Sequence, residues 1–164
     1  MYQKSGQAVQ VTSYNRVVLA EGVPGATTFL LGGCRTSAVI EAERPSCVSL
    51  MVANRTDWYV RHSYGYVIVE SERDTGHLPL FLLHSNFILH SDTFYPKCYA
   101  FAAVNYRQSY ITSIGDGSLV LNALIGIASP EETASFRVFD YNTSSKFHCL
   151  LSLRRRGYCT SSCI

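Results

Sequence analysis

Three stretches of this 164-residue chain resemble one another at intervals of about 50 residues. The stretch CVSLMVANRTDWYVRH (47–62) aligns with CYAFAAVNYRQSYITS (98–113), and the earlier stretch VTSYNRVVLAE (11–21) aligns with RHSYGYVIVES (61–71). A unit of a few short strands cannot bury its apolar face alone, so units of this size share one core. The repeat therefore predicts three similar units packed around a common centre.

The residue types favour β-strands in all three units. The chain has 11 Tyr and 8 Phe together with many Val, Ile and Thr, and no window combines helical apolar spacing with helix caps. A closed arrangement of three units also removes the exposed edge strands that promote aggregation. We therefore predict an all-β fold, a β-trefoil that occupies residues 1–164 as a single domain.

The units have predictable boundaries. We expect the three copies to occupy roughly 8–46, 47–97 and 98–148, and each to close on an aromatic residue, namely Phe29, Phe81 and Phe136. The first copy lacks an opening strand of its own, whereas the C-terminal stretch CLLSLRRRGYCTSS resembles such a strand. We therefore expect 149–164 to complete the first copy, through a strand from about Phe147 to Thr160, so that the two ends of the chain close the ring.

Six cysteines and two N-glycosylation sequons bear on the cellular compartment. The sequons are Asn54-Arg55-Thr56 and Asn142-Thr143-Ser144. Both features suit an extracellular or secretory-lumen piece of a larger protein. The first residues lack the apolar region of a signal peptide, and no apolar run of roughly 18 residues is present that could span a bilayer.

The pairing of the cysteines stays open at this stage. A terminal disulfide and free thiols are both compatible with the spacing. Cys47, Cys98 and Cys149 recur at the repeat interval, which would place all three around the axis of the trefoil. An alignment that sets Cys149 over Leu50 instead makes it an inward core residue, and we prefer it because it also aligns Tyr158 with Tyr59.

The copies resemble a known family. CVSLMVANRTDWYVRH and CYAFAAVNYRQSYITS are similar to the repeat openings of the AbfB-type arabinofuranose-binding trefoil domains of α-L-arabinofuranosidases, whose pattern is Val-Ser-Phe-Glu-Ser-Val-Asn-Tyr-Pro-Gly-x-Tyr-Leu-Arg-His. The copy ends ATTFLL, LPLFLL and TASFRV resemble that family's Asp-Ala-Thr-Phe-Arg-Val. The resemblance implies a binding module whose sugar pockets each use the His of Arg-His and the Asp three residues before the closing Phe.

These pocket residues are degenerate in this chain. The His is kept as His62, and the other two places hold Thr12 and Ser113, with Ser161 near the C-terminal equivalent. The Asp is kept nowhere, because its places hold Ala26, Leu78 and Thr133. Asp92, in HSDTFYP, would join His62 only if the register shifts between His77 and Tyr95, which the sequence leaves open.

The candidate binding site is therefore His62 with Tyr59, Arg61 and Trp58, extended by Asp92 in the shifted register. An imidazole exchanges one hydrogen bond with a sugar hydroxyl, a carboxylate accepts two, and an aromatic side chain covers the apolar face of a sugar ring. In the plainer interpretation, His62 caps a turn and Trp58 fills a hairpin corner.

We expect no catalytic residue, no cofactor and no metal. GDG at 115–117 suits a two-residue hairpin turn with positive φ rather than a phosphate loop. The clusters at 84–86 and 90–92 lack the scaffold of a Ser-His-Asp triad. Zinc needs closer ligand spacing than the C-terminal set provides, which is His148, Cys149, Cys159 and Cys163.

The charge of the chain excludes a strongly basic nucleic-acid binder. The formal net charge is +2 and only 16 % of residues are charged. Three arginines, 154–156, crowd one predicted hairpin tip, where they are solvated or contact an acidic glycan or protein surface. We predict a glycan-binding module without membrane insertion. The alternative is a protein-interaction domain that has lost sugar binding and uses its loops and this tip.

Overall fold

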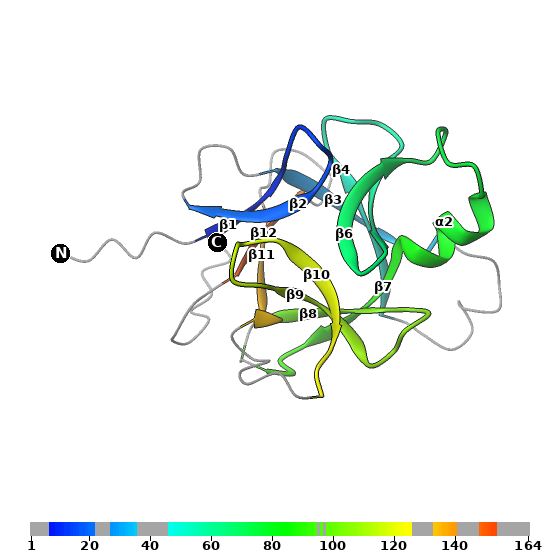
Figure 1. Ribbon diagram of the computed structural model, residues 1–164. Helices are drawn as coiled ribbons and strands as arrows, with labels where there is room; N and C mark the ends of the chain where they lie inside the picture. The colour runs from blue at the N-terminus through cyan, green and yellow to red at the C-terminus, as the bar shows by residue number, and fades with distance from the viewer. Residues whose placement is uncertain are drawn as a thin grey trace.

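The computed structural model describes residues 7–21, 27–35, 46–94, 96, 98–125, 133–140 and 148–153. These residues form an antiparallel, all-β structure with one short helix, which confirms the predicted class (Figure 1). The elements are β1 (Gln7–Val11), β2 (Val17–Glu21), β3 (Thr28–Gly33), β4 (Cys47–Val52), β5 (Trp58–Ser63), β6 (Tyr66–Ser71), α2 (Leu78–His84), β7 (Asn86–Ser91), β8 (Tyr99–Ala103), β9 (Ser109–Ser113), β10 (Leu119–Ala123), β11 (Phe136–Asp140) and β12 (His148–Leu153).

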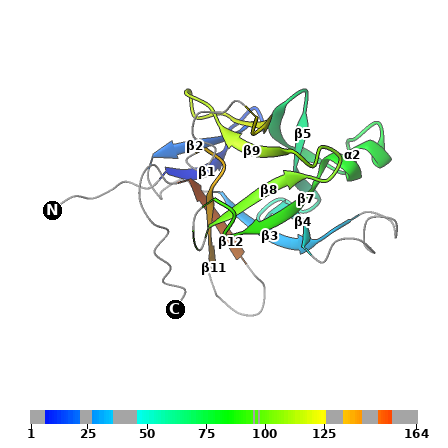
Figure 2. The same ribbon diagram turned by 90° about the horizontal axis from the view of Figure 1, so that it is seen from below.

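Strand pairing closes a barrel. β3 pairs with β4, β4 with β7, β7 with β8, β8 with β11, β11 with β12, and β12 returns to β3. Seen from below, β12 lies beside β3 and β11 although it comes last in the chain (Figure 2). β12 also pairs with β1 at the start of the chain. A closed ring satisfies the backbone hydrogen bonds that edge strands would expose.

Three hairpins, β1–β2, β5–β6 and β9–β10, accompany this barrel and are joined in a cycle. In each hairpin a turn carbonyl accepts a hydrogen bond from a strand amide of another hairpin. The three bonds run from Val69 N to the Asn15 carbonyl (2.8 Å), from Leu121 N to the Gly65 carbonyl (2.8 Å) and from Leu19 N to the Gly117 carbonyl (2.7 Å). All three acceptor residues have positive φ, between 60° and 84°.

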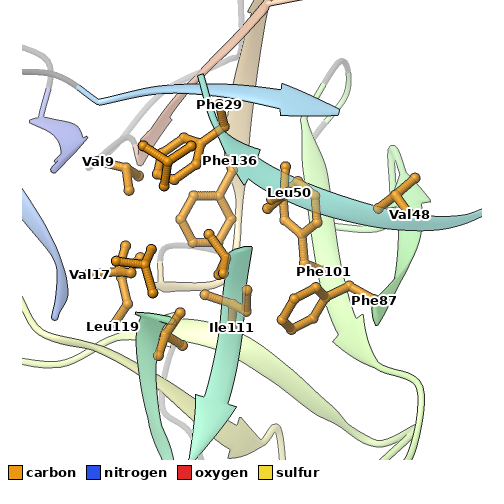
Figure 3. Packing of buried hydrophobic residues seen from close by; sticks show 14 of the residues in the cluster. Val9, Val17, Phe29, Val48, Leu50, Phe87, Phe101, Ile111, Leu119 and Phe136 are labelled. Atoms are coloured by element: carbon orange, nitrogen blue, oxygen red, sulfur yellow. The ribbon is translucent and has the colours of Figure 1, made fainter. Parts of the chain in front are cut away.

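The core lies inside the barrel and under the hairpins. Phe136 sits at its centre, with Phe29, Leu50 and Phe101 around it (Figure 3). The rings of Phe101 and Phe136 meet edge to face, with centroids 5.9 Å apart. These four side chains are at most 1 % exposed, as expected for the residues that supply most of the hydrophobic stabilisation.

The barrel register identifies the aromatic residues that correspond to one another. Phe29 pairs with Val52, Phe87 with Ala103 and Phe136 with Leu153 at the same point of their strand pairs. Phe81, which the sequence suggested for this role, lies instead in α2 and is fully buried there. Aligned on Phe29, Phe87 and Phe136, Leu151 takes the position of Leu50. Cys149 then takes that of Val48, a register that differs from both alignments considered above.

α2 lies in the stretch expected to close the second copy, where no helix was predicted. Pro79 stands in the first turn of the helix, where its missing N–H has no intrahelical partner to lose. His77 caps the helix, since its Nδ1 accepts a hydrogen bond from the Leu80 amide at 3.2 Å. A proline cannot donate to a strand ladder, so the apolar run LPLFLL forms a helix that contacts β5 and β7.

The structure also answers part of the cysteine question. Cys34 and Cys47 form a disulfide with a Cα–Cα distance of 5.2 Å, and Cys98 is disulfide-bonded as well. The sequon at Asn142, the arginines at 154–156 and the last two cysteines lie outside the described residues. Within the described part, no helix is long and apolar enough to cross a membrane.

The hairpin cycle predicts that Gly117→Ala destabilises the fold. Gly117 has a φ of +84°, and a Cβ there would lie 2.9 Å from the carbonyl oxygen of Leu19. Leu19 is also the residue whose amide donates to the Gly117 carbonyl in the cycle. We expect a loss of roughly 1–3 kcal/mol in the free energy of unfolding, measured by urea denaturation. Gly115→Ala is the matched control, because its Cβ meets nothing within 4 Å. Equal stability of the two variants would contradict the role of the cycle.

Candidate functional site

The predicted site residues on β5 do not all face the same way. Alternate side chains of a strand point to opposite faces. His62 is 4 % exposed and points inward with Val60, whereas Tyr59 and Arg61 are on the other face and only partly buried. The strand therefore divides the candidate residues into two separate groups.

His62 meets residues from two other elements. Its imidazole stacks on that of His84 at the end of α2, with ring centroids 4.1 Å apart and planes tilted by 32°. Its Nε2 lies 2.9 Å from the Asn105 Oδ1, in the turn between β8 and β9. Because an amide oxygen only accepts, His62 donates through Nε2. The edge of the Tyr106 ring completes the group, at a centroid distance of 5.7 Å. We call these four residues the histidine site.

His84 was missed by the sequence analysis, and the reason is the register. With Phe81 as the closing residue of the second copy, the third position before it is Leu78. With Phe87 in the structural position of Phe29 and Phe136, the third position before it is His84. Leu78 is 45 % exposed on α2 and has no place in the histidine site. Aligning HSNFIL with ATTFLL and TASFRV would have found His84 from the sequence.

Both imidazoles are held neutral near pH 7. Burial lowers the pKa of His62, and the charge of Arg61 lowers it further, while the hydrogen bond to Asn105 acts in the opposite direction. Burial also lowers the pKa of His84 to about 4, and the charges of His62 and Arg61 lower it further, while a hydrogen bond to the His62 backbone acts in the opposite direction. Two imidazolium ions stacked at this distance would repel each other, so neutral rings fit the geometry.

The histidine site has unused hydrogen-bonding capacity. The Nδ1 of His84 is buried and has no hydrogen-bond partner in the described part of the chain. Tyr106 is 57 % exposed, so its ring borders solvent next to His62. Neutral imidazoles can both donate to and accept from a hydroxyl group, and an exposed tyrosine can cover an apolar ring face. The arrangement suits a polar, uncharged ligand.

Tyr59 and Arg61 belong to a second cluster. The Arg35 guanidinium lies 3.7 Å from the centre of the Tyr59 ring and forms an ion pair with Glu72. Arg61 pairs with Glu70 at 2.6 Å. Each arginine thus has a carboxylate partner, and the cluster braces the outer face of β5.

Trp58 stands apart from His62. Its indole ring lies 5.2 Å from the Arg55 guanidinium, and the Arg55 Nη1 donates to the Asn15 Oδ1 in the first hairpin turn at 3.2 Å. This placement agrees with the plainer interpretation of Trp58 as the filling of a hairpin corner.

Asp92 is not brought to the histidine site. It follows the last residue of β7, with φ of 55°, and its amide donates to the Cys98 carbonyl at 2.9 Å. His84 lies before the first residue of the same strand. A six-residue strand at roughly 3.3 Å per residue separates the two by about 20 Å. The shifted register that would join Asp92 to His62 is therefore not adopted.

No group of three or more His, Cys, Asp or Glu side chains that could hold a metal ion occurs among the described residues. The C-terminal histidine and cysteine set lies mostly beyond them.

Comparison with known proteins finds similar solved structures but no matching family. No protein-family model and no curated protein matches the chain. A solved arabinofuranosidase complexed with arabinofuranosyl-α-1,2-xylobiose is similar at 25 % identity and a TM-score of 0.50, over 58 % of this chain and 20 % of that one. A GH54 α-L-arabinofuranosidase soaked with a cyclic sulfate inhibitor has 25 % identity and a TM-score of 0.48, over 57 % and 19 %.

A variant of a GH54 α-L-arabinofuranosidase, soaked with 4-nitrophenyl α-L-arabinofuranoside, is similar at 23 % identity and a TM-score of 0.49, over 65 % of this chain and 21 % of that one. The matched region spans about a fifth of each of the three chains. The similarity at a TM-score of 0.50 supports a fold related to one part of that arabinofuranosidase.

The stacked pair predicts a coupled change in histidine titration. In His62→Ala, His84 loses both its covering ring and a neighbouring titratable group, so its pKa should rise from about 4 toward 6.5. Histidine ring signals in NMR spectra recorded against pH measure this shift. His90, whose pKa burial also lowers, packs on Tyr110 instead and serves as the internal control. An unchanged His84 titration would contradict the pairing.

The same pKa shifts predict a dependence of stability on pH. The unfolded chain binds a proton at each histidine near pH 6.5, whereas the folded protein resists it, so acid favours unfolding. This contribution is fully present above about pH 6.5 and is lost as the pH falls toward about 4. Urea denaturation across this range should give a smaller stability loss for His84→Gln than for wild type. Identical pH profiles would refute the assignment.

Proposed function

We propose that this chain is a non-catalytic carbohydrate-binding module and that the histidine site binds a neutral glycan. The observation that carries the proposal is the neutral His62–His84 pair beside the exposed Tyr106 ring. Sugars present adjacent hydroxyl groups and an apolar ring face. The imidazoles can form hydrogen bonds with the hydroxyl groups, and the tyrosine ring can pack on the apolar face.

We further propose that the fold is a β-trefoil of three copies. β4, β8 and β12 play the same part in the pairing, since each contacts two barrel neighbours and the first strand of a hairpin. The cycle of hairpin-turn hydrogen bonds supports the same threefold arrangement. In this proposal β12 serves as the opening strand of the first copy.

Arabinofuranosyl groups are the ligand class that we propose. The resemblance of the repeat openings to arabinofuranose-binding domains supports this choice, as does the structural similarity to an arabinofuranosidase. His84 occupies the position that the resemblance assigns to an aspartate. Replacing a carboxylate by an imidazole leaves one acceptor instead of two, so we expect weak binding and a single functional site.

The absence of catalysis is part of the proposal. Glycoside hydrolysis commonly uses two carboxyl groups that flank the scissile bond. In the part of the chain that the structure describes, His62 meets the imidazole of His84, the amide of Asn105 and the ring of Tyr106, and the nearby Glu70 is paired with Arg61. These features favour binding over hydrolysis.

We propose an extracellular location within a larger protein. The disulfide between Cys34 and Cys47 and the disulfide-bonded Cys98 support an oxidising compartment, where such bonds persist. The similar region in the arabinofuranosidases is also one part of a longer chain.

A protein-interaction domain is the second candidate. Tyr14 and Tyr64 on two hairpin tips are 87 % and 100 % exposed, and exposed tyrosines are frequent in protein interfaces. This observation favours a partner bound by the hairpin tips instead of the histidine site.

Titration with arabinofuranosyl oligosaccharides tests the proposal, preceded by a glycan array that includes sulfated glycans. We expect His62→Ala and His84→Ala each to weaken binding about tenfold or more, because a buried hydrogen bond to a ligand is worth about 1–3 kcal/mol. His90→Ala is the matched control, as a half-buried histidine outside the site. Absence of binding by well-folded protein would reject a glycan module and favour the second candidate.

A further inference from the structure

The turn between β4 and β5 carries the sequon Asn54-Arg55-Thr56. All three residues are exposed to solvent. The turn is well defined, since Arg55 N donates to the Val52 carbonyl at 3.1 Å and Trp58 N donates to the Arg55 carbonyl at 3.2 Å. A sequon on an exposed turn can carry a large group without disturbing the core.

The side chains next to Asn54 form contacts with other residues, whereas the side chain of Asn54 forms no hydrogen bond within the described part of the chain. Arg55 contacts Asn15 and Trp58, and Asp57 pairs with Arg73 at 2.6 Å. The side chains of Asn54 and Thr56 make no hydrogen bond to any other residue in the described ranges. The two groups that define the sequon are thus available to an enzyme.

A comparison of two corresponding turns explains why Asn54 is available. Asn54 aligns with Asn105, which is turned toward the neighbouring copy and holds His62 at 2.9 Å. In the copy that neighbours Asn54, the position of His62 is occupied by Thr12. The Thr12 hydroxyl accepts a hydrogen bond from the Arg16 amide at 3.2 Å within its own hairpin. Asn54 therefore lacks the imidazole partner that holds Asn105.

We propose that Asn54 is an acceptor site for N-linked glycosylation. The Nδ2 of Asn54 forms a bond to C1 of the first sugar of a lipid-linked oligosaccharide diphosphate, and the nitrogen loses a proton. The C1–oxygen bond to the diphosphate breaks, and the diphosphate leaves with the electron pair. The attached glycan then projects from the β4–β5 turn into solvent.

The location separates this glycan from the histidine site. Asn54 belongs to the β4–β5 turn, whereas the histidine site uses Asn105 and Tyr106 of the β8–β9 turn. An attached glycan at Asn54 instead borders the Arg55 side chain that packs on Trp58. This assignment does not depend on the proposed function, because either type of binding module would accommodate it.

The test is expression of the full chain, with an added secretion signal, in eukaryotic cells that glycosylate a co-expressed reporter glycoprotein. Peptide mapping by mass spectrometry, before and after treatment with peptide-N-glycosidase F, locates the modified asparagine and separates Asn54 from the second sequon. We expect a glycopeptide at Asn54 and its conversion to aspartate by the enzyme.

Three variants make the result specific. Asn54→Gln and Thr56→Ala should abolish the modification at this turn, whereas Thr56→Ser should keep it, because serine preserves the sequon. Circular dichroism of the secreted proteins should show the same fold in all of them. A secreted, folded wild-type chain with unmodified Asn54, beside a glycosylated reporter, would overturn the proposal.

Discussion

The structure depends on the cycle of hydrogen bonds that joins its three hairpins. Each bond uses the carbonyl of a turn residue with positive φ, a conformation that glycine adopts freely and asparagine tolerates. Few other residues could adopt this conformation and direct a carbonyl at a neighbouring strand. The turns are therefore formed by Asn15, Gly65 and Gly117. Since every hairpin accepts from one neighbour and donates to the other, loss of one bond weakens the contact between two hairpins.

The histidine site follows from this closed architecture and from one local departure from it. Closure brings the end of β5 beside the β8–β9 turn, so that His62 reaches Asn105. The irregular element is α2, which contains Pro79, a residue that does not suit a regular strand. The helix ends at His84, whose ring stacks on that of His62. Burial and mutual proximity then keep both rings neutral, and the proposed binding of uncharged hydroxyl groups rests on this property.

The β4–β5 turn with Asn54 and the β8–β9 turn with Asn105 are similar in sequence but differ in their contacts. Asn105 accepts a hydrogen bond from His62, whereas the position that would serve Asn54 in the same way holds Thr12, whose hydroxyl is bonded within its own hairpin. The two asparagines occupy equivalent positions in the sequence alignment. The difference between them comes from the residue at the position of His62 in the neighbouring hairpin. Divergence at a single contact thus distinguishes the proposed binding site from the proposed glycosylation site.

The sequence by itself determined the all-β class, because aromatic and β-branched residues alternate in short segments separated by turns. It also singled out His62 through the Arg-His pair of the family resemblance. Only the tertiary structure decided that His84 is its partner and that Asp92 is remote. The reason is that α2 occupies the stretch around Phe81, so that Phe87 of β7 takes the barrel position expected for Phe81, and contacts between residues distant in the chain depend on that register.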